Sequence, residues 1–252
     1  MKIVIPSYNR PGMIKDKTLA FLHRNNVLPE EIDIIVETDK MKEEYITYTG
    51  PQYNYIVSNT KGVGEKRNFV RSYYRDETDL EEIVCIDDDI DDLVDIDKPL
   101  DLRQLIVDAF HICKEYDICM WGVCPFHNPF FMKRSPLISS NLKYICGAFF
   151  GLVIDRNKYL IHTDIDHGED YQFTMEHYLR DGGVLRFNHI SIHTKYFYEK
   201  GGICGSLGGL KNRQKQMKDN SEYLVERYEG MCCLKLKKLG YDIRLNGSYK
   251  KK

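Results

Sequence analysis

The sequence predicts an α/β fold built on a mixed, mostly parallel sheet flanked by helices. Before residue 90, apolar segments alternate with helical segments in the order strand, helix, strand, strand, helix, strand, which is the pattern of a parallel sheet with helical crossovers. Each expected strand is a short apolar run, as is typical of buried strands. Polar clusters follow three of these runs, and ligands bind where parallel strands end. We therefore expect a ligand site at the carboxyl ends of the strands.

The individual elements follow from the apolar runs and the residues that interrupt them. Pro6 ends the first strand, and Gly182 and Gly183 end a helix in the second half. Ser221 is the expected N-cap of the last helix, with Gly240 just past its end. Strands are expected at residues 2–5, 32–38, 54–58, 82–86, 118–123, 143–154 and 184–193. Helices are expected at residues 14–25, 65–74, 102–116, 168–181 and 220–239.

Charge is distributed unevenly along the 252 residues, although the net charge is only −2. Residues 76–101 contain 13 acidic residues and one basic residue, whereas residues 206–252 contain 12 basic and 5 acidic residues. An acidic centre suits cations, and a basic end suits phosphates, nucleic acid or an anionic surface. The alternative is a solvated helix face followed by a charged tail.

The cysteines and the start of the chain indicate an intracellular protein. No two of the eight cysteines have the C-x-x-C spacing of a structural zinc site, and several lie in apolar runs, so we expect reduced core residues. The chain begins with a strand and shows no signal peptide. No apolar run approaches the ~20 residues that cross a bilayer. We expect a soluble protein of the cytoplasm or nucleus, or a viral or phage protein in a host cell, with no membrane partner.

Three consecutive carboxylates, Asp87, Asp88 and Asp89, directly follow the apolar run at residues 82–86. Alternate side chains of a strand share a face, so Asp87 and Asp89 should point one way and Asp88 the other. Two carboxylates on one face form half of a site for Mg²⁺ or Mn²⁺, which phosphate oxygens and water can complete. The alternative is a solvated acidic loop, but the preceding strand favours a metal site.

Gly62 and Gly64 form a flexible turn before the helix expected at residues 65–74. The backbone amides of a helix N-terminus favour anions, and Lys66 and Arg67 add positive charge for a diphosphate. The spacing is neither that of a dinucleotide-binding fingerprint nor that of a P-loop. Two glycines in a turn are common, so this segment alone is weak evidence for a phosphate site.

Glu169 and Asp170 begin another expected helix, where a carboxylate can act as general base on an acceptor hydroxyl. Acidic residues are also common there because they complement the helix dipole. His189 and His193 flank Ser191 in an expected strand and share a face. Either histidine could be an ordinary core or surface residue, and a metal role requires carboxylates that only the fold can bring close.

Six segments in order resemble the GT-A-fold glycosyltransferases. They are residues 3–11 (IVIPSYNRP), 62–68 (GVGEKRN), 85–89 (CIDDD), 147–151 (GAFFG) and 168–170 (GED), followed by His193. The resemblance covers residue 3 to about residue 205. It implies a GT-A type, Rossmann-like sheet, with a catalytic domain at residues 1–205 and a basic C-terminal helical extension at residues 206–252 packed on it.

The resemblance also implies roles for individual residues. Asp170 would be the general base and Glu169 would hold the acceptor. The residues implied to contact a nucleotide-sugar donor, a UDP-sugar, are Pro6, Ser7, Tyr8, Arg10, Glu37, Asp39, Lys66, Arg67, Asp87, Asp88, Gly147 and Ala148. The residues implied to hold a divalent metal, Mn²⁺ or Mg²⁺, are Asp89, Asp87 and His193. A base opposite the leaving diphosphate implies in-line attack with inversion.

A finer resemblance concerns the first three segments, which are similar to glycosyltransferases associated with base J and with TET/JBP oxygenases. Those enzymes modify 5-hydroxymethylpyrimidines in DNA, so glucose becomes the expected sugar and DNA a possible acceptor. The basic segment at residues 206–252 would then contact DNA phosphates, and the target base would be flipped toward Asp170. A glycan, lipid or protein acceptor, or a nucleotidyltransferase, remain the alternatives.

Overall fold

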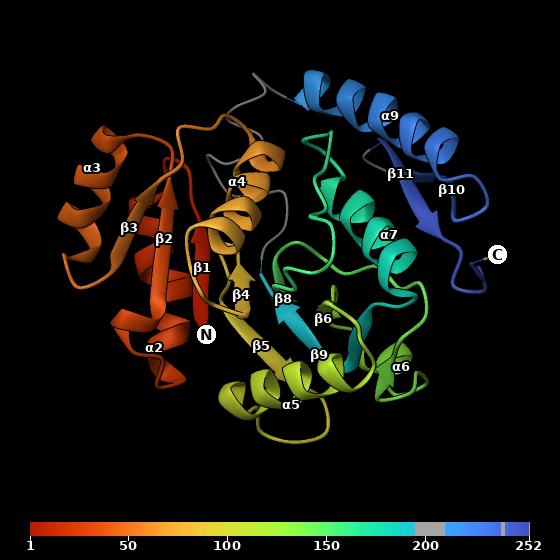
Figure 1. The fold of residues 1–252 in the computed structure, drawn as a ribbon, viewed down its shortest axis with the longest axis horizontal. Helices are drawn as coiled ribbons and strands as arrows, with labels where there is room; N and C mark the ends of the chain where they lie inside the picture. The colour runs from red at the N-terminus through yellow and green to blue at the C-terminus, as the bar shows by residue number, and fades with distance from the viewer. Residues whose placement is uncertain (195–209, 238–239, 252) are drawn as a thin grey trace.

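A nine-stranded sheet forms the centre of the protein, with the strand order β3-β2-β1-β4-β8-β6-β9-β5 and with β7 paired to β9. The computed structural model describes residues 1–194, 210–237 and 240–251 (Figure 1). The strands are β1 (Lys2–Pro6), β2 (Ile32–Val36), β3 (Asn54–Val57), β4 (Glu82–Ile86), β5 (Asp92–Asp95), β6 (Met120–Cys124), β7 (Ile138–Ser139), β8 (Phe149–Val153) and β9 (Leu185–His193).

The strand directions confirm the predicted fold class. β1, β2, β3 and β4 run parallel to one another. β8 lies antiparallel between β4 and β6, and β9 runs parallel to β6. β5 and β7 are antiparallel to β9. Most strands therefore share one direction, and the carboxyl ends of β1, β2, β4, β6 and β9 meet at one edge.

Helices cover both faces of this sheet. They are α1 (Pro11–Ile14), the π-helical turn η1 (Lys15–Leu19), α2 (Ala20–Arg24), the 3-10 turn η2 (Pro29–Glu31), α3 (Asp39–Thr49), α4 (Val63–Asp76), α5 (Leu102–Glu115), α6 (Pro129–Met132), α7 (Glu169–Asp181) and α9 (Leu210–Arg227). The helix expected at residues 168–181 ends as predicted, because Gly182 adopts the left-handed conformation at its C-terminus, with φ of 76°.

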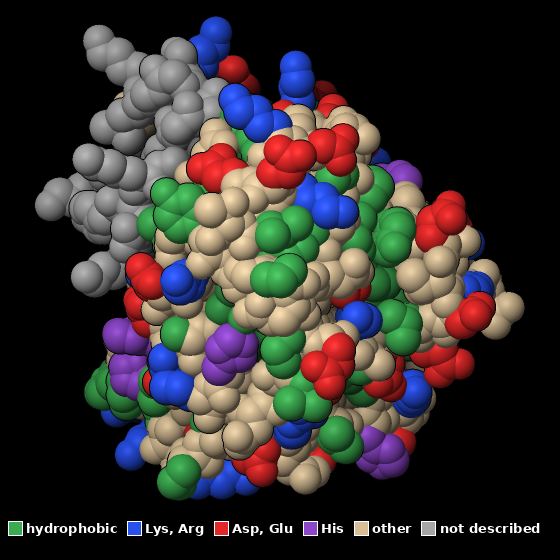
Figure 2. All heavy atoms as spheres, turned by 90° about the vertical axis from the view of Figure 1, so that its left-hand side faces the viewer, with side chains coloured by type: hydrophobic (Ala, Val, Ile, Leu, Met, Phe, Trp, Pro, Cys, Tyr) green, Lys and Arg blue, Asp and Glu red, His purple; other side chains and the backbone are tan. Residues whose placement is uncertain are grey.

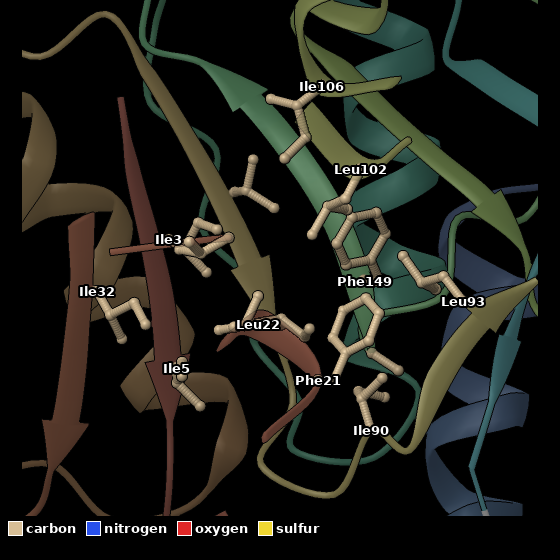
Figure 3. Packing of buried hydrophobic residues seen from close by; sticks show 14 of the residues in the cluster. Ile3, Ile5, Phe21, Leu22, Ile32, Ile90, Leu93, Leu102, Ile106 and Phe149 are labelled. Carbon is tan, nitrogen blue, oxygen red and sulfur yellow. The ribbon is translucent and has the colours of Figure 1, made fainter. Parts of the chain in front are cut away.

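Two apolar cores lie on opposite faces of the sheet. Successive side chains of β1 alternate between them, so that Ile3 and Ile5 belong to one core and Val4 to the other. Side chains of α2 and α5 pack on the first face (Figure 3). The second core takes Val70 from α4 and Phe173 from α7. The sheet is therefore covered on both sides, as a mostly parallel sheet requires.

Helix α3 was not predicted, because residues 32–58 were expected to hold two strands without a helix between them. Its sequence is largely polar, and only Tyr45 and Thr49 are buried in it. An apolar period was therefore absent, and the helix is instead marked by its cap, in which the Thr38 hydroxyl accepts a hydrogen bond from the Met41 amide at 3.3 Å. The face that carries α3 and β3 shows acidic and basic side chains interspersed (Figure 2).

The helix expected at residues 220–239 is wrong beyond residue 227. Helix α9 begins at Leu210, so Ser221 lies inside it and is buried rather than capping it. Gly230, with φ of 78°, follows the helix. The chain then forms an antiparallel hairpin of β10 (Cys232–Lys237) and β11 (Gly240–Leu245). The alternation of apolar and basic residues from Leu234 to Lys237 has the period of a strand, not of a helix.

The C-terminal extension packs on the rest of the protein. Leu224, Tyr228, Met231 and Ile243 belong to the same apolar core as Phe173 of α7. The extension is thus a helix and a hairpin rather than helices alone. Of its basic residues, Lys238 and Lys252 lie outside the described residues.

The strand expected at residues 143–154 is shorter than predicted, since β8 covers only Phe149–Val153. Part of the acidic run forms a strand where the sequence predicted none. This strand is β5, whose Leu93 is buried.

The cysteines within the described residues lie largely in the cores. The buried free thiols are Cys85, Cys113, Cys119, Cys124, Cys146 and Cys232, and Cys233 is exposed. Cys204 lies outside the described residues. Within the part of the chain that the structure describes, no helix has both the length and the apolar character to cross a bilayer.

Candidate functional site

The three aspartates lie in a turn, because β4 ends at Ile86. Their side chains therefore do not alternate as those of a strand would. The Arg10 Nη1 atom lies 3.1 Å from Oδ1 of Asp88 and 3.2 Å from Oδ2 of Asp89. Asp87 points elsewhere, toward Arg67. The predicted pairing of Asp87 with Asp89 on one face is therefore wrong, and Asp88 and Asp89 share a cation.

Asp88 is the most buried of the three carboxylates and forms hydrogen bonds with the loop after β1. It accepts hydrogen bonds from the Ser7 hydroxyl and from Arg10. The Ser7 hydroxyl also lies 2.6 Å from the Tyr45 hydroxyl, which accepts a hydrogen bond from the Arg10 amide at 2.9 Å. Burial raises the pKa of Tyr45 to about 12, so its hydroxyl stays protonated. Tyr45 was missed in the sequence because it belongs to the unpredicted helix α3.

Thr18, in the π-helical turn η1, stabilises the aspartate turn through two hydrogen bonds to its backbone. Its hydroxyl donates to the Asp87 carbonyl at 2.7 Å and accepts from the Ile90 amide at 3.0 Å. Two backbone groups of the turn are thereby satisfied, which holds Asp87, Asp88 and Asp89 in place. No local pattern in the sequence marks Thr18 for this role.

Arg67, from the first turns of α4, joins two carboxylates that are far apart in the sequence. Its guanidinium donates to Asp87 at 3.0 Å and to Glu169, and also to the Gly147 carbonyl at 2.9 Å. A Cβ on Gly147 would lie 2.0 Å from the Arg67 Nη1 atom, so a larger residue there would displace this guanidinium. The predicted donor residues Arg67, Asp87 and Gly147 therefore meet at one point.

The cluster around Arg67 carries excess negative charge. Burial raises the pKa of Asp87 to about 7, against the opposing charge of Arg67. Burial likewise raises the pKa of Glu169 to about 8, again against Arg67. One guanidinium faces these two carboxylates and the charge of nearby Asp170. The cluster therefore favours uptake of a proton or of another cation.

Asp170, at the start of α7, is oriented by two donors. Its Oδ2 atom accepts hydrogen bonds from the Tyr144 hydroxyl and, at 3.2 Å, from the Gly147 amide. The Tyr144 ring stacks on Tyr171 with 4.1 Å between centroids. Burial, and then the charge of Asp170, raise the pKa of Tyr144 well above its usual value, so its hydroxyl remains a donor. Tyr144 was not predicted as a site residue, because it precedes the GAFFG segment and no local motif marks it.

The N-terminus of α4, expected to bind a diphosphate, already holds a carboxylate of the chain itself. The Gly64 amide donates to Oδ1 of Asp166 at 3.0 Å. Gly62 has a φ of 83°, and a Cβ there would lie 2.6 Å from the same oxygen. A helix N-terminus attracts an anion, and here Asp166 supplies it.

Lys66 stabilises the loop after β1 through a hydrogen bond to its backbone. It is buried and donates to the Ser7 carbonyl at 3.0 Å, and its ammonium lies 5.3 Å from the centre of the Tyr8 ring. Burial lowers its pKa, an effect that the charge of Glu37 opposes. Glu37 and Asp39 follow β2, with Asp39 exposed at the start of α3. These residues therefore border the same carboxyl edge as the aspartates.

Pro6 and Ala148 complete the predicted donor residues. Pro6 ends β1 and lines a narrow hollow together with Arg67, Asp87 and Gly147. The Ala148 carbonyl accepts a hydrogen bond from the Asp87 amide at 2.9 Å. Both therefore lie at the carboxyl edge, beside the aspartate turn.

His193 ends β9 at the same edge. Its carbonyl accepts a hydrogen bond from the Asp91 amide at 3.0 Å, and the neighbouring Thr194 hydroxyl donates to the Asp89 carbonyl at 2.7 Å. His189 is engaged elsewhere, with Nδ1 2.5 Å from Asp97 and Nε2 3.0 Å from the Ser135 carbonyl. Of the two histidines, His193 is thus the one next to the aspartates.

Asp87, Asp89 and His193 have the ligand types that Mg²⁺ and Mn²⁺ accept. In the described part of the chain, no three metal-ligating side chains are already gathered around one point. Asp87 uses Oδ1 and Asp89 uses Oδ2 in their ion pairs, and neither second oxygen forms a hydrogen bond with the described residues. The ligand types fit a divalent cation, but the three side chains do not converge on one point in the described part of the chain.

Several solved structures resemble this chain, whereas no protein-family model and no curated protein matches its sequence. A protein described as a nucleotide-diphospho-sugar transferase of Desulfovibrio desulfuricans is 14% identical, with 90% of this chain and 99% of that chain covered and a TM-score of 0.48. A UDP-glucose pyrophosphorylase complexed with UDP-glucose is 8% identical, with 88% and 98% covered and a TM-score of 0.44. A galactosyltransferase in complex with donor and acceptor sugar analogues is 8% identical, with 86% and 95% covered and a TM-score of 0.44.

Proposed function

We propose that this protein is a metal-dependent, inverting glycosyltransferase that moves a sugar from a UDP-sugar to an acceptor hydroxyl. The observation that carries the proposal is the position of Arg67, which contacts Asp87 on one side and Glu169, the neighbour of Asp170, on the other. Asp87, suited to the donor, and Glu169, which adjoins the proposed base Asp170, thereby both contact one cation. The GT-A resemblance assigns these same residues to donor and base.

The chain's own residues divide the work of transfer between two regions. The loop after β1, held by Asp88 and Lys66, would line the nucleotide, and Asp87 would contact the ribose and sugar. A divalent metal held by Asp89, His193 and an Asp87 side chain turned away from Arg67 would supply positive charge for the leaving diphosphate. Asp170 would accept the proton of the acceptor hydroxyl as that oxygen attacks the sugar. Attack from the side opposite the diphosphate inverts the configuration at the sugar carbon.

Glu169 acts on Arg67 in this proposal rather than on the acceptor. Its side chain is buried, and its Oε1 atom is engaged by the Arg67 guanidinium. Glu169 is therefore best described as the residue that positions Arg67 between the donor region and Asp170.

Release of UDP tests the proposed reaction directly. With Mn²⁺, a panel of UDP-sugars that includes UDP-glucose, and hydroxyl acceptors, we expect the protein to release UDP in proportion to product formed. Chelation of the metal with EDTA should stop the release, and added Mn²⁺ should restore it. Release of pyrophosphate from a nucleoside triphosphate and a sugar phosphate would instead show a nucleotidyltransferase. A folded protein that releases neither product would contradict both reactions.

We further propose DNA containing 5-hydroxymethyluracil or 5-hydroxymethylcytosine as the acceptor. Helix α9 lies beside the start of α7, because the Asn220 side chain donates to the His167 carbonyl at 2.9 Å. Lys215 and Lys218 are exposed on this helix. A DNA backbone lying along α9 would therefore pass close to Asp170. Phosphate contacts of this kind are attractive and depend strongly on salt.

Replacing Lys215 and Lys218 by glutamine should weaken transfer to DNA uniformly across sequences. We expect the slope of log affinity against log salt to fall by about two, one for each phosphate that no longer meets a lysine. Arg103→Gln with Lys114→Gln, which removes two exposed charges of α5, is the matched control and should leave the slope unchanged. If transfer occurs only to glycans, lipids or proteins, DNA is not the acceptor.

A further inference from the structure

A second hollow lies between α4 and α7, at the edge of the sheet opposite the candidate active site. The two helices lie side by side on one face of the sheet (Figure 1). The hollow has a cavity volume of about 30 Å³ and is partly open to solvent. Its floor includes residues 152–155, which end β8 beside the start of β4, since the Ile154 amide donates to the Glu81 carbonyl at 2.7 Å. It therefore opens away from the carboxyl edge, although Arg71 and Leu152 also line the narrow hollow beside Pro6.

Positive charge dominates the lining of this hollow. Four cationic side chains and a single carboxylate, that of Asp155, face it, and the cations are Arg71, Arg75, Lys158 and Arg180. Arg67, Arg71 and Arg75 are four residues apart along α4 and so lie on one side of the helix. The eight residue steps from Arg67 to Arg75 span about 12 Å along the helix. One arginine row thus runs from the candidate active site into the second hollow.

Arg71 is the unusual member of this row. Its side chain is only 3% exposed, and it forms no ion pair with the described residues. Its Nη2 atom donates to the Asn68 side chain and, at 3.4 Å, to the Thr163 hydroxyl, and its guanidinium lies 4.1 Å from the centre of the Phe173 ring. Its Nε atom has no hydrogen-bond partner among the residues that the structure describes. A buried charge without a counter-ion is costly, so an anion at Arg71 would relieve it.

Two of the other cations at the hollow, Arg180 and Lys158, form ion pairs with carboxylates that do not line it. Arg180 donates to Asp181 at 2.7 and 2.9 Å, and Lys158 lies 2.7 Å from Asp117 and 3.4 Å from Asp181. Neither Asp117 nor Asp181 lines the hollow. Arg75 approaches its neighbour Asp76 at a distance of 4.0 Å, too long for a hydrogen bond. Arg71 and Arg75 are therefore the two arginines available to a ligand.

Two groups of the lining add little charge of their own. Burial lowers the pKa of His177 to about 3, so this histidine is neutral. The Asp155 carboxylate accepts a hydrogen bond from the Asn157 amide at 2.8 Å, which holds it within its own turn. The balance at the hollow therefore remains positive.

We propose that this hollow is a binding site for a small phosphate-class oxyanion, held by Arg71 and Arg75 with Lys158 at its side. Guanidinium groups bind phosphate oxygens through paired, charge-assisted hydrogen bonds. The anion would occupy the position of the counter-ion that Arg71 lacks. The site is independent of the proposed sugar transfer. The ligand is either free inorganic phosphate or the phosphate group of a sugar phosphate.

Titration of the full-length protein with inorganic phosphate, followed by calorimetry and by thermal unfolding, tests this site. We expect saturable binding and a rise in the unfolding temperature with phosphate. Arg75→Gln, a change near the surface that keeps the core intact, should weaken binding about tenfold, the effect of roughly 1.4 kcal/mol. Arg71→Lys should weaken it as well, because lysine keeps the charge but loses the paired geometry.

Two further variants separate this hollow from the rest of the molecule. Arg10→Gln, at the candidate active site, should leave the calorimetric phosphate affinity unchanged even though loss of the Asp88 partner lowers stability. Arg103→Gln, on α5, should also leave phosphate binding unchanged. Absence of binding by the unaltered protein, or binding that is lost in Arg10→Gln and kept in Arg75→Gln, would overturn the proposal. A parallel titration with glucose 1-phosphate identifies the source of the phosphate, since tighter binding of either compound that depends on Arg75 supports the site.

Discussion

Asp170→Asn is expected to remove sugar transfer while leaving UDP-sugar binding unchanged. The amide has nearly the shape of the carboxylate and can still accept the hydrogen bond of Tyr144, but it cannot accept a proton from the acceptor hydroxyl. General-base catalysis contributes on the order of 10²–10⁴-fold to a rate, and the loss should be of that size. Initial rates of UDP release and calorimetric donor binding measure the two effects separately.

Two further variants serve as controls for Asp170→Asn. Asp108→Asn makes the same change on the exposed face of α5, where the carboxylate accepts a hydrogen bond from Gln104, and should have full activity. Tyr144→Phe removes a donor that orients Asp170 and should lower the rate less than Asp170→Asn does. If Asp170→Asn retains full activity, another group is the base and the proposed role of Asp170 is wrong.

Asp89→Ala is expected to abolish metal-dependent donor binding without unfolding the protein. Arg10 contacts both Asp88 and Asp89, so it keeps its partnership with Asp88 when Asp89 is removed. Asp89 is also the more accessible of the two, with a side chain 19% exposed against 8% for Asp88. We expect UDP binding to become insensitive to Mn²⁺ and EDTA, and the unfolding temperature to stay close to that of the unaltered protein.

Asp88→Ala is the contrasting change and should act mainly on stability. Asp88 is buried beneath Ser7 and Arg10, and its removal leaves the Arg10 charge with one partner and the Ser7 hydroxyl with one fewer acceptor. Loss of one partner from a buried ion pair costs about 3–5 kcal/mol. A drop in unfolding temperature with Asp88→Ala but not with Asp89→Ala would separate the structural carboxylate from the metal-binding one. The reverse pattern would contradict these roles.

The parts of the fold that could be predicted are those whose side chains are buried in a regular pattern. The strands at residues 2–5 and 82–86 were recognisable because both faces of each strand are covered, which requires continuous apolar runs. Helix α3 could not be recognised in this way, because only Tyr45 and Thr49 are buried in it. The hairpin after residue 231 was misjudged because its alternating residues were assigned to the preceding helix. Hydrophobic periodicity in the sequence indicates which side chains are buried, and a largely polar helix shows little of this periodicity.

The sequence by itself determined the edge of the sheet at which the candidate site lies and most of the residues found there. Parallel strands end together, so the segments after β1, β2 and β4 had to meet. Tertiary structure alone decided how those residues are paired. It turned Asp87 toward Arg67 and Glu169, gave Asp88 and Asp89 a shared arginine, and placed Tyr144 on Asp170. These contacts join segments that are distant in the chain, and their geometry depends on packing that no local pattern encodes.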